Sequence, residues 1–419
     1  MTACAHSSLS FEQSSFAQRT DYSRPNKKQR TAALPSHSII SPADDAFCAP
    51  LILPGDDLAE DPEYPPQSFR EWLEDEDRNE VTPSKRTLYV VPPPAALSYM
   101  TSWSTPKHAQ NDPTQPPEVD DVAEYLSAFY HGLPVKVLSE SPLRFTSWDN
   151  NTSKSPRFIG LQTSTECIRI RTRASKDGTF QRQLNLDDLL DVAISILPKD
   201  AFALLLLVPY DIYENADDDF ACGRAYGGSR VAVISTARYH PALDDQQRVS
   251  RDHAWPASHC TRYMEDCCTE ADAPPPKKKK KRAPKGELPG PTQSPLHAAV
   301  AAHSSLQDTS VETLSALWLS RACKTASHEL GHCLGIDHCV YYACIMQGTA
   351  SLAEDARQPP FLCPIDHAKL LHATTSNCDP KSKSNAERDR NHALLAFCDK
   401  HPKCHLLKAF AAWIRAQQT

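Results

Sequence analysis

Residues 328–338 read H-E-L-G-H-C-L-G-I-D-H, and this segment constrains the chain more than any other. It fits the pattern H-E-x-x-H-x-x-G-x-x-H. In a helix, residues four apart lie one turn above each other on one face, so His328 and His332 can direct their rings at one metal ion. Glu329 lies beside that face, close enough to reach a metal-bound water. The segment therefore predicts a helix built around a zinc site.

A third ligand cannot come from the same short helix without distortion. Gly335 permits a sharp turn after Leu334, which ends the helix and returns His338 to the metal. Upstream, Thr309 and Glu312 have the T-x-x-E spacing of a capping box, so we expect the helix to begin there.

Three neutral imidazoles leave one position of a zinc ion open, which distinguishes catalytic from structural sites. Zinc lowers the pKa of a bound water to about 7. Glu329 would accept its proton as the water attacks a peptide carbonyl, and would then pass the proton to the leaving amine. The prediction is a zinc metallopeptidase, a hydrolase with zinc ligands His328, His332 and His338 and with Glu329 as the general base. The alternative is a chance match on a surface helix, and the fixed offsets of Gly335 and His338 argue against it.

Further signals follow the third histidine. Met346 lies eight residues after His338, and metzincins carry a methionine in a turn beneath the zinc site. Cys339 and Cys344 precede it, and Cys363 comes later. On their own, the three cysteines could be small buried hydrophobic residues.

The whole run, His-Cys-x4-Cys-x-Met followed at a distance by Cys-x-x-Cys, resembles the archaemetzincins, a family of metzincin-type zinc metallopeptidases. The resemblance implies a second, structural zinc held by four cysteines beside the catalytic one. Here Asp366 stands where the family has its fourth cysteine. Zinc accepts carboxylate oxygen, so the expected second site is Cys339, Cys344, Cys363 and Asp366. His367 and Cys378 are alternative last ligands.

Similarity to that family extends over about residues 87–375. The softer upstream matches are residues 205–213, 223–225 and 231–235. In metzincins an edge strand above the active-site helix pairs with extended substrate, and residues 229–234 are our candidate for that strand.

Apolar patterns upstream predict alternating strands and helices. Residues 87–91, 134–138, 167–171, 201–208 and 230–235 have strand patterns. Residues 122–129 and 186–197 have helical apolar stripes. The expected fold is α/β (α+β): a metzincin-like mixed twisted sheet layered with helices, with a long active-site helix.

The chain has 419 residues and 35 Pro, much of it in polar stretches. We therefore expect one catalytic domain at 86–380, a disordered N-terminal tail at 1–85 and a C-terminal helical extension at 381–419. A short helix at residues 69–73 is expected to be transient, the alternative being that it docks on the domain. Residues 241–295 are predicted to be a disordered basic loop insertion.

The first twenty residues lack an apolar signal core, and no apolar run approaches membrane-spanning length. We therefore expect an intracellular protein, in the cytoplasm and/or nucleus, whose fifteen cysteines are thiols and metal ligands. The net charge of −7 predicts no global attraction to nucleic acid or membrane. Residues 277–285, from Lys277 to Lys285, fit a nuclear import signal or a nucleic-acid patch, or else a solvated linker.

The expected partner is a peptide or protein substrate, cleaved by an aminopeptidase-like or short-peptide activity. Two alternatives remain: a nuclear protease acting on DNA–protein crosslinks, and a zinc-stabilised binding protein with vestigial catalysis. The intact Glu329 argues against the second, because a structural site needs no carboxylate there. No sequence pattern encodes the cleavage specificity or the oligomeric state.

Overall fold

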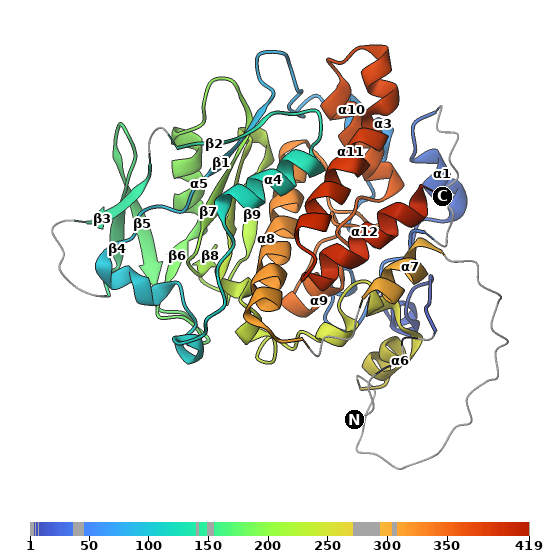
Figure 1. The fold of residues 1–419 in the computed structure, drawn as a ribbon, viewed down its shortest axis with the longest axis horizontal. Coiled ribbons are helices and arrows are strands. Elements are labelled where there is room, and N and C mark those ends of the chain that lie inside the picture. The colour runs from blue at the N-terminus through green and yellow to red at the C-terminus, as the bar shows by residue number, and fades with distance from the viewer. Residues whose placement is uncertain are drawn as a thin grey trace.

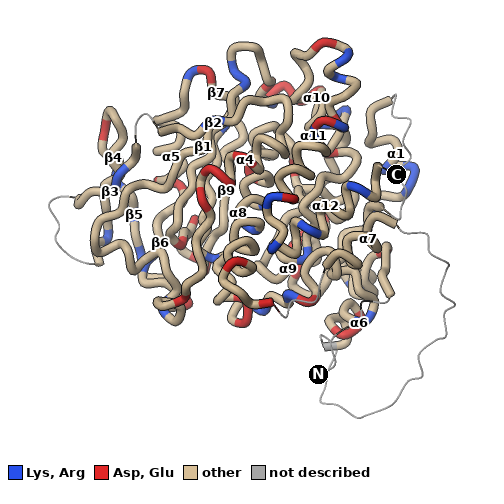
Figure 2. Tube along the Cα trace, viewed as in Figure 1, with Lys and Arg blue, Asp and Glu red and all other residues tan. Residues whose placement is uncertain are grey.

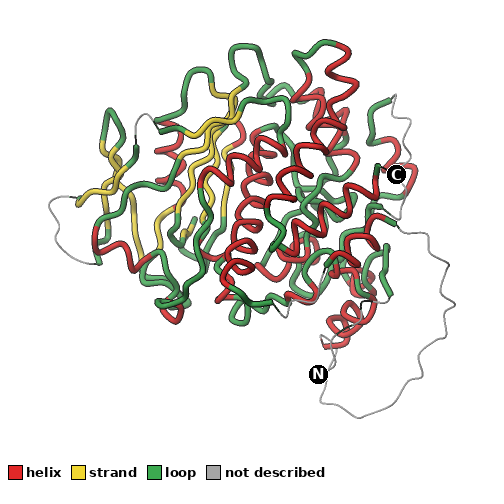
Figure 3. The backbone as a smooth tube through the Cα atoms, in the orientation of Figure 1, coloured by secondary structure: helices red, strands yellow, loops and turns green. Residues whose placement is uncertain are grey.

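Strands occupy one side of the molecule and most of the helices the other (Figures 1 and 3). This computed structural model describes residues 4, 6, 8–36, 46–139, 142–148, 155–270, 294–303 and 308–418. It confirms the predicted mixed α/β architecture, with two sheets layered against helices.

The central sheet has five strands in the order β2-β1-β7-β10-β9. The first four are parallel, and β9 is antiparallel to β10. Their bounds are β1 Thr87–Val91, β2 Val135–Val137, β7 Ala201–Val208, β9 Gly223–Tyr226 and β10 Val231–Ser235. The sequence predicted four of them. The substrate strand predicted at 229–234 is wrong in one respect: β10 is internal, because β9 covers its outer side and forms the edge.

Strand β7 lies at the centre of the sheet, and all eight of its residues are buried. Its side chains alternate between two apolar clusters. Leu205 and Leu207 pack on the side that holds the long helices, whereas Leu204 and Leu206 pack on the side of the second sheet. A continuous apolar run is what a parallel strand covered on both faces requires.

The second sheet has the order β3-β4-β5-β6-β8, antiparallel except between β6 and β8. Its strands are β3 Arg144–Ser147, β4 Phe158–Gln162, β5 Cys167–Arg173, β6 Gln183–Asn185 and β8 Ile212–Tyr213. Only β5 was predicted, since the others are short or lack a clear alternation.

Helix α8 (Val311–Cys333) is the longest and packs against β9, β10 and α4. The remaining α-helices are α1 Lys27–Ala32, α2 Asp57–Glu60, α3 Phe69–Glu74, α4 Val119–Phe129, α5 Leu186–Ser195, α6 Thr261–Glu270, α7 Pro295–Ala302, α9 Leu352–Arg357, α10 Pro364–Thr375, α11 Pro380–Lys400 and α12 His405–Gln417. The 3₁₀ turns are η1 Ser15–Arg19, η2 Ser98–Trp103, η3 Lys107–Ala109, η4 Gly227–Ser229, η5 Ala237–Tyr239, η6 Pro241–Leu243, η7 Arg251–His253 and η8 Ala257–His259.

The N-terminal segment differs from the disordered tail predicted at 1–85. Its buried residues Ala33, Leu34 and Trp72 belong to the main core cluster, and α3 is docked. Trp72 is fully buried and donates its indole N–H to the Leu334 carbonyl at 2.8 Å. The Arg78 guanidinium covers the Trp72 ring at 4.3 Å. Single buried residues such as Trp72 hold this segment to the core without forming a periodic apolar pattern. For this reason the sequence did not predict that the segment is ordered.

The C-terminal boundary also differs from the prediction. Leu394, Phe397 and Phe410 of α11 and α12 belong to the same core cluster as α4 and α8, so these two helices are part of the same folded body. Of the insertion predicted at 241–295, residues 241–270 form short 3₁₀ turns and α6. Its basic run, Lys277 to Lys285, lies outside the described residues.

Figure 2 shows acidic and basic residues interspersed along the described trace, without separation by sign in that view. Among the described residues, every helix is too short or too polar to cross a membrane.

Candidate metal centre

Helix α8 positions the predicted site, and both of its ends follow from local chemistry. Ser310, rather than the predicted Thr309, is the N-cap, and its hydroxyl accepts the N–H of Thr313. At the other end, Gly335 has φ +75°. Its N–H donates to His332 O at 3.0 Å, and the next N–H, of Ile336, donates to Gly331 O at 3.1 Å. This is the hydrogen-bond pattern of a Schellman C-cap, which turns the chain back toward the helix.

The turn brings His338 beside the two helix histidines. The ring centroid of His328 lies 4.7 Å from that of His332 and 5.3 Å from that of His338, and the centroids of His332 and His338 lie 4.9 Å apart. One ligand nitrogen from each ring lies within 4.8 Å of the others. The structure therefore assembles the three residues that the spacing predicted.

Both helix histidines have one ring nitrogen already engaged. The Nδ1–H groups of His328 and His332 donate to the carbonyls of Ile345 and Ile336, at 2.7 and 2.8 Å. In these tautomers the two Nε2 lone pairs face each other at 3.0 Å. A shared cation relieves that repulsion, and backbone-oriented imidazoles are usual at metal sites. The residues present therefore fit a bound zinc ion.

Burial keeps these imidazoles neutral. It lowers the pKa of His332 to about 4, lowers that of His328 well below its usual value and lowers that of His338 as well. The neighbouring histidines lower the first two further. Neutral imidazole is the form that binds metals.

Glu329 faces a cavity of about 540 Å³ whose wall also includes His328 and His338. Burial raises the pKa of the Glu329 carboxyl to about 8, and Arg224 partly opposes the shift. A cation held by the histidines would favour the charged carboxylate. On its other side lies the edge strand: a Cβ on Gly223 would come within 3.0 Å of Glu329 Oε1. The absence of a side chain at Gly223 keeps space beside this carboxylate.

Met346 lies directly under the helix. A Cβ on Gly331 would come within 2.6 Å of its sulfur, so the two residues fit closely. The Met346 carbonyl accepts the N–H of Cys339 at 2.8 Å, which closes the loop between them. Met346 is thus placed where a methionine turn was predicted.

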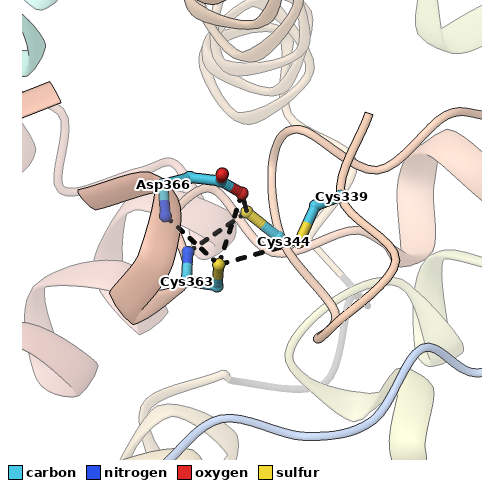
Figure 4. A group of neighbouring side chains, drawn as sticks. All are labelled: Cys339, Cys344, Cys363 and Asp366. Atoms are coloured by element: carbon cyan, nitrogen blue, oxygen red, sulfur yellow. Dashed lines mark hydrogen bonds between the residues drawn. The ribbon is translucent and has the colours of Figure 1, made fainter. Parts of the chain in front are cut away.

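The second predicted site is also assembled, and all four of its members are buried (Figure 4). The Sγ atoms of Cys339 and Cys363 are 3.6 Å apart. Asp366 Oδ2 lies 3.4 Å from the sulfur of Cys344 and 3.3 Å from that of Cys363. Asp366, the residue that departs from the four-cysteine pattern, therefore directs one oxygen at the sulfurs.

The other Asp366 oxygen is paired. Lys369 Nζ lies 2.9 Å from Asp366 Oδ1. It also donates to the backbone carbonyl of Gln67 at 2.9 Å and to its side-chain Oε1 at 2.8 Å. The same Gln67 side chain donates to the Gly335 carbonyl at 3.0 Å and accepts the Asp337 N–H at 3.2 Å. Gln67 thus connects the turn before His338 with the cysteine cluster.

The alternative last ligands lie elsewhere. His367 is near Glu387, with His367 Nδ1 3.9 Å from Glu387 Oε1, and the sulfur of Cys378 is directed at the Thr374 carbonyl. Neither belongs to a group of metal-ligating atoms found among the described residues.

Sequence reasoning missed two residues beside the histidines. The Tyr64 ring lies 5.4 Å from that of His338. The Asp57 carboxylate is nearby, because a Cβ on Gly348 would meet both Asp57 Oδ2 and His338 Nδ1. Both come from the segment predicted to be a tail, and no local pattern marks either of them.

Sequence comparisons with known proteins point to one family. The family model of peptidase family M54 matches residues 297–370. Archaemetzincin-2 of Pongo abelii is 25% identical over 332 residues, which is 78% of this chain and 71% of that protein. Archaemetzincin-1 of Homo sapiens is 28% identical over 228 residues, or 51% of this chain and 36% of that one. A solved archaemetzincin from Methanopyrus kandleri aligns with 74% of this chain and 97% of its own, at 18% identity and a TM-score of 0.31.

Proposed function

Since this chain belongs to the archaemetzincin family, we propose that it is a zinc-dependent metallopeptidase of the metzincin type. The observation that carries the proposal is the grouping of His328, His332 and His338 beside a cavity whose wall includes His328, His338 and Glu329. A zinc ion held there would supply Lewis-acid chemistry and a nucleophile near neutral pH.

The side chains of this site divide the remaining work. Glu329 takes a proton from the attacking water and returns it to the leaving amine, which requires the carboxylate form at the start. A cation held by the histidines would favour this charged form, against the raised pKa that burial alone gives the carboxyl. Strand β9, the free edge above α8, offers backbone groups to an extended peptide. These features favour hydrolysis over a vestigial role.

The cavity wall favours an aminopeptidase-like activity. Asp218 and Asp219 line the same space as Glu329, and Lys324 in the wall is paired with Asp355 at 3.2 Å. The two aspartates are thus placed to attract a free N-terminal ammonium group. Neither the crosslink protease nor the binding protein is favoured by the family matches, and an intracellular location remains our proposal.

Short peptides that differ only in N-terminal acetylation test this function. We expect the free amine to be cleaved at least about tenfold faster, because one ion pair in a partly desolvated site is worth about 1.4 kcal/mol or more. The measurement is kcat/KM by mass spectrometry of the products. Equal rates for both peptides would contradict the aminopeptidase-like activity, and no cleavage of either would contradict the peptidase.

We also propose that Cys339, Cys344, Cys363 and Asp366 hold a second, structural zinc. Burial raises the pKa values of Cys344 and Cys363, and it raises that of Asp366 to about 7. A cluster with these properties gives up its protons when a divalent cation binds. Lys369 offsets part of the negative charge that a carboxylate adds to three thiolates.

An Asp366→Ala variant should lose one zinc per chain and become less stable by about 3–5 kcal/mol, because the buried Lys369 loses the carboxylate of its ion pair and keeps only the neutral Gln67 oxygens. Zinc content by elemental analysis and urea unfolding measure the two effects. The matched control is Asp366→Cys, which supplies the thiolate that zinc favours and should keep the metal. An unchanged zinc content in Asp366→Ala would show that Asp366 is not a ligand.

A further inference from the structure

A third group of metal-ligating side chains lies outside both sites described above. It consists of Cys4, His253 and Cys260, whose ligand atoms all lie within 4.8 Å of one another. The sulfurs of Cys4 and Cys260 are 3.6 Å apart. One member comes from the start of the chain, and the other two come from the segment that precedes α6.

Backbone pairing explains how such distant residues meet. Leu9 forms an antiparallel bridge with Cys260. On either side of it, the Ser10 N–H donates to His259 O at 2.9 Å and the Thr261 N–H donates to Ser8 O at 3.0 Å. Residues 8–10 are therefore fixed beside residues 259–261, a few residues from Cys4.

The separations suit a tetrahedral ion. Zinc binds sulfur at about 2.3 Å and nitrogen at about 2.0–2.1 Å, so neighbouring ligand atoms lie about 3.3–3.8 Å apart. The Cys4–Cys260 separation of 3.6 Å falls in this range and equals that between Cys339 and Cys363. All fifteen cysteines of the chain are free thiols in this structure.

His253 is oriented as a ligand. Its Nδ1 is within hydrogen-bond distance of the Ser250 hydroxyl at 3.1 Å, and its ring stacks on Tyr263 at 4.2 Å. These contacts fix the His253 ring and leave its Nε2 as the atom that can bind a metal. An outer partner of this kind holds the tautomer and ring orientation at metal sites.

A second histidine lies beside this group, outside its set of mutually close ligand atoms. The His6 ring is 5.3 Å from that of His253, edge to face. Its Nε2 is buried and has no hydrogen-bond partner within the described part of the chain.

We propose that Cys4, His253 and Cys260 form a zinc site that fastens the N-terminal segment to the loop before α6. The fastened segment supports the cysteine loop, because the Tyr22 hydroxyl donates to Val340 O at 2.6 Å and Arg24 Nε donates to Tyr341 O at 2.9 Å. The site is structural, and its existence does not depend on the peptidase activity.

Zinc content of the full-length protein tests the proposal. The protein is expressed with added zinc, purified with a reducing agent and dialysed against zinc-free buffer. We expect Cys4→Ser and Cys260→Ser each to carry one zinc per chain fewer than the wild type. The matched control is Cys167→Ser, at an exposed cysteine outside the three groups, and it should match the wild type.

Limited proteolysis provides the second measurement. Losing the fastening ion should speed cleavage within residues 8–36 in Cys4→Ser, relative to Cys167→Ser. Cys4 is half-buried at the start of the chain, so this variant keeps the catalytic core. Equal zinc in wild type and both cysteine variants would overturn the site. So would a Cys4–Cys260 disulfide in unreduced wild type, seen as a mass lower by two hydrogens.

Discussion

A Glu329→Gln variant will bind zinc as the wild type does and will hydrolyse peptides about 10²–10⁴-fold more slowly, the range that a positioned general base contributes. The amide has the size of the carboxylate but cannot accept a proton at neutral pH. The loss should appear in kcat, with KM little changed, because Glu329 acts on the proton and not on substrate binding. Steady-state kinetics and elemental analysis on the same preparations measure both properties.

The matched control is Glu312→Gln, an exposed glutamate in the first turn of the same helix. It should keep full activity. If Glu329→Gln retains the wild-type kcat, another group is the base. If it loses zinc, its effect on rate cannot be assigned to proton transfer.

Replacing His332 by alanine should remove one zinc per chain and abolish peptide hydrolysis. His332 supplies one of the three ring nitrogens grouped here, so its loss leaves only His328 and His338 as protein ligands. The fall in metal affinity should exceed the roughly 10- to 100-fold that outer-partner changes cause. Zinc per chain and residual kcat/KM after dialysis are the measurements.

The exposed His392→Ala is the control and should change neither quantity. Unchanged zinc in His332→Ala would mean that the three histidines do not hold the catalytic ion. Loss of zinc with full peptide hydrolysis would show that the reaction does not need this ion, and would contradict the proposed mechanism.

The histidine grouping could be predicted because its geometry is local. Helix periodicity fixes His328 relative to His332, and a left-handed glycine at 335 fixes the return of His338. The same holds for β7, whose eight-residue apolar run has one physical solution, a strand covered on both faces. The cysteine cluster was accessible through the family resemblance, which also located the departure at Asp366.

Other parts were out of reach because they depend on contacts between distant segments. Trp72 donates a hydrogen bond to Leu334, beside the turn after α8, and Tyr64 lies beside His338. Both residues come from a stretch with no apolar periodicity. The free edge of the sheet was misplaced, since a four-residue strand with Gly223 at its start gives no strand signal. Cys4 pairs with residues more than half the chain away, and no spacing rule links them.

Gln67 has a consequence for how the two proposed ions communicate. Its side-chain amide contacts Gly335 and Asp337 on one side and Lys369 on the other. Lys369 in turn holds Asp366. Because these hydrogen bonds join the two ends, we expect the two ions to bind cooperatively. By thermodynamic reciprocity, the structural ion would raise the protein's affinity for the catalytic ion by a certain factor. The catalytic ion would raise the affinity for the structural ion by the same factor.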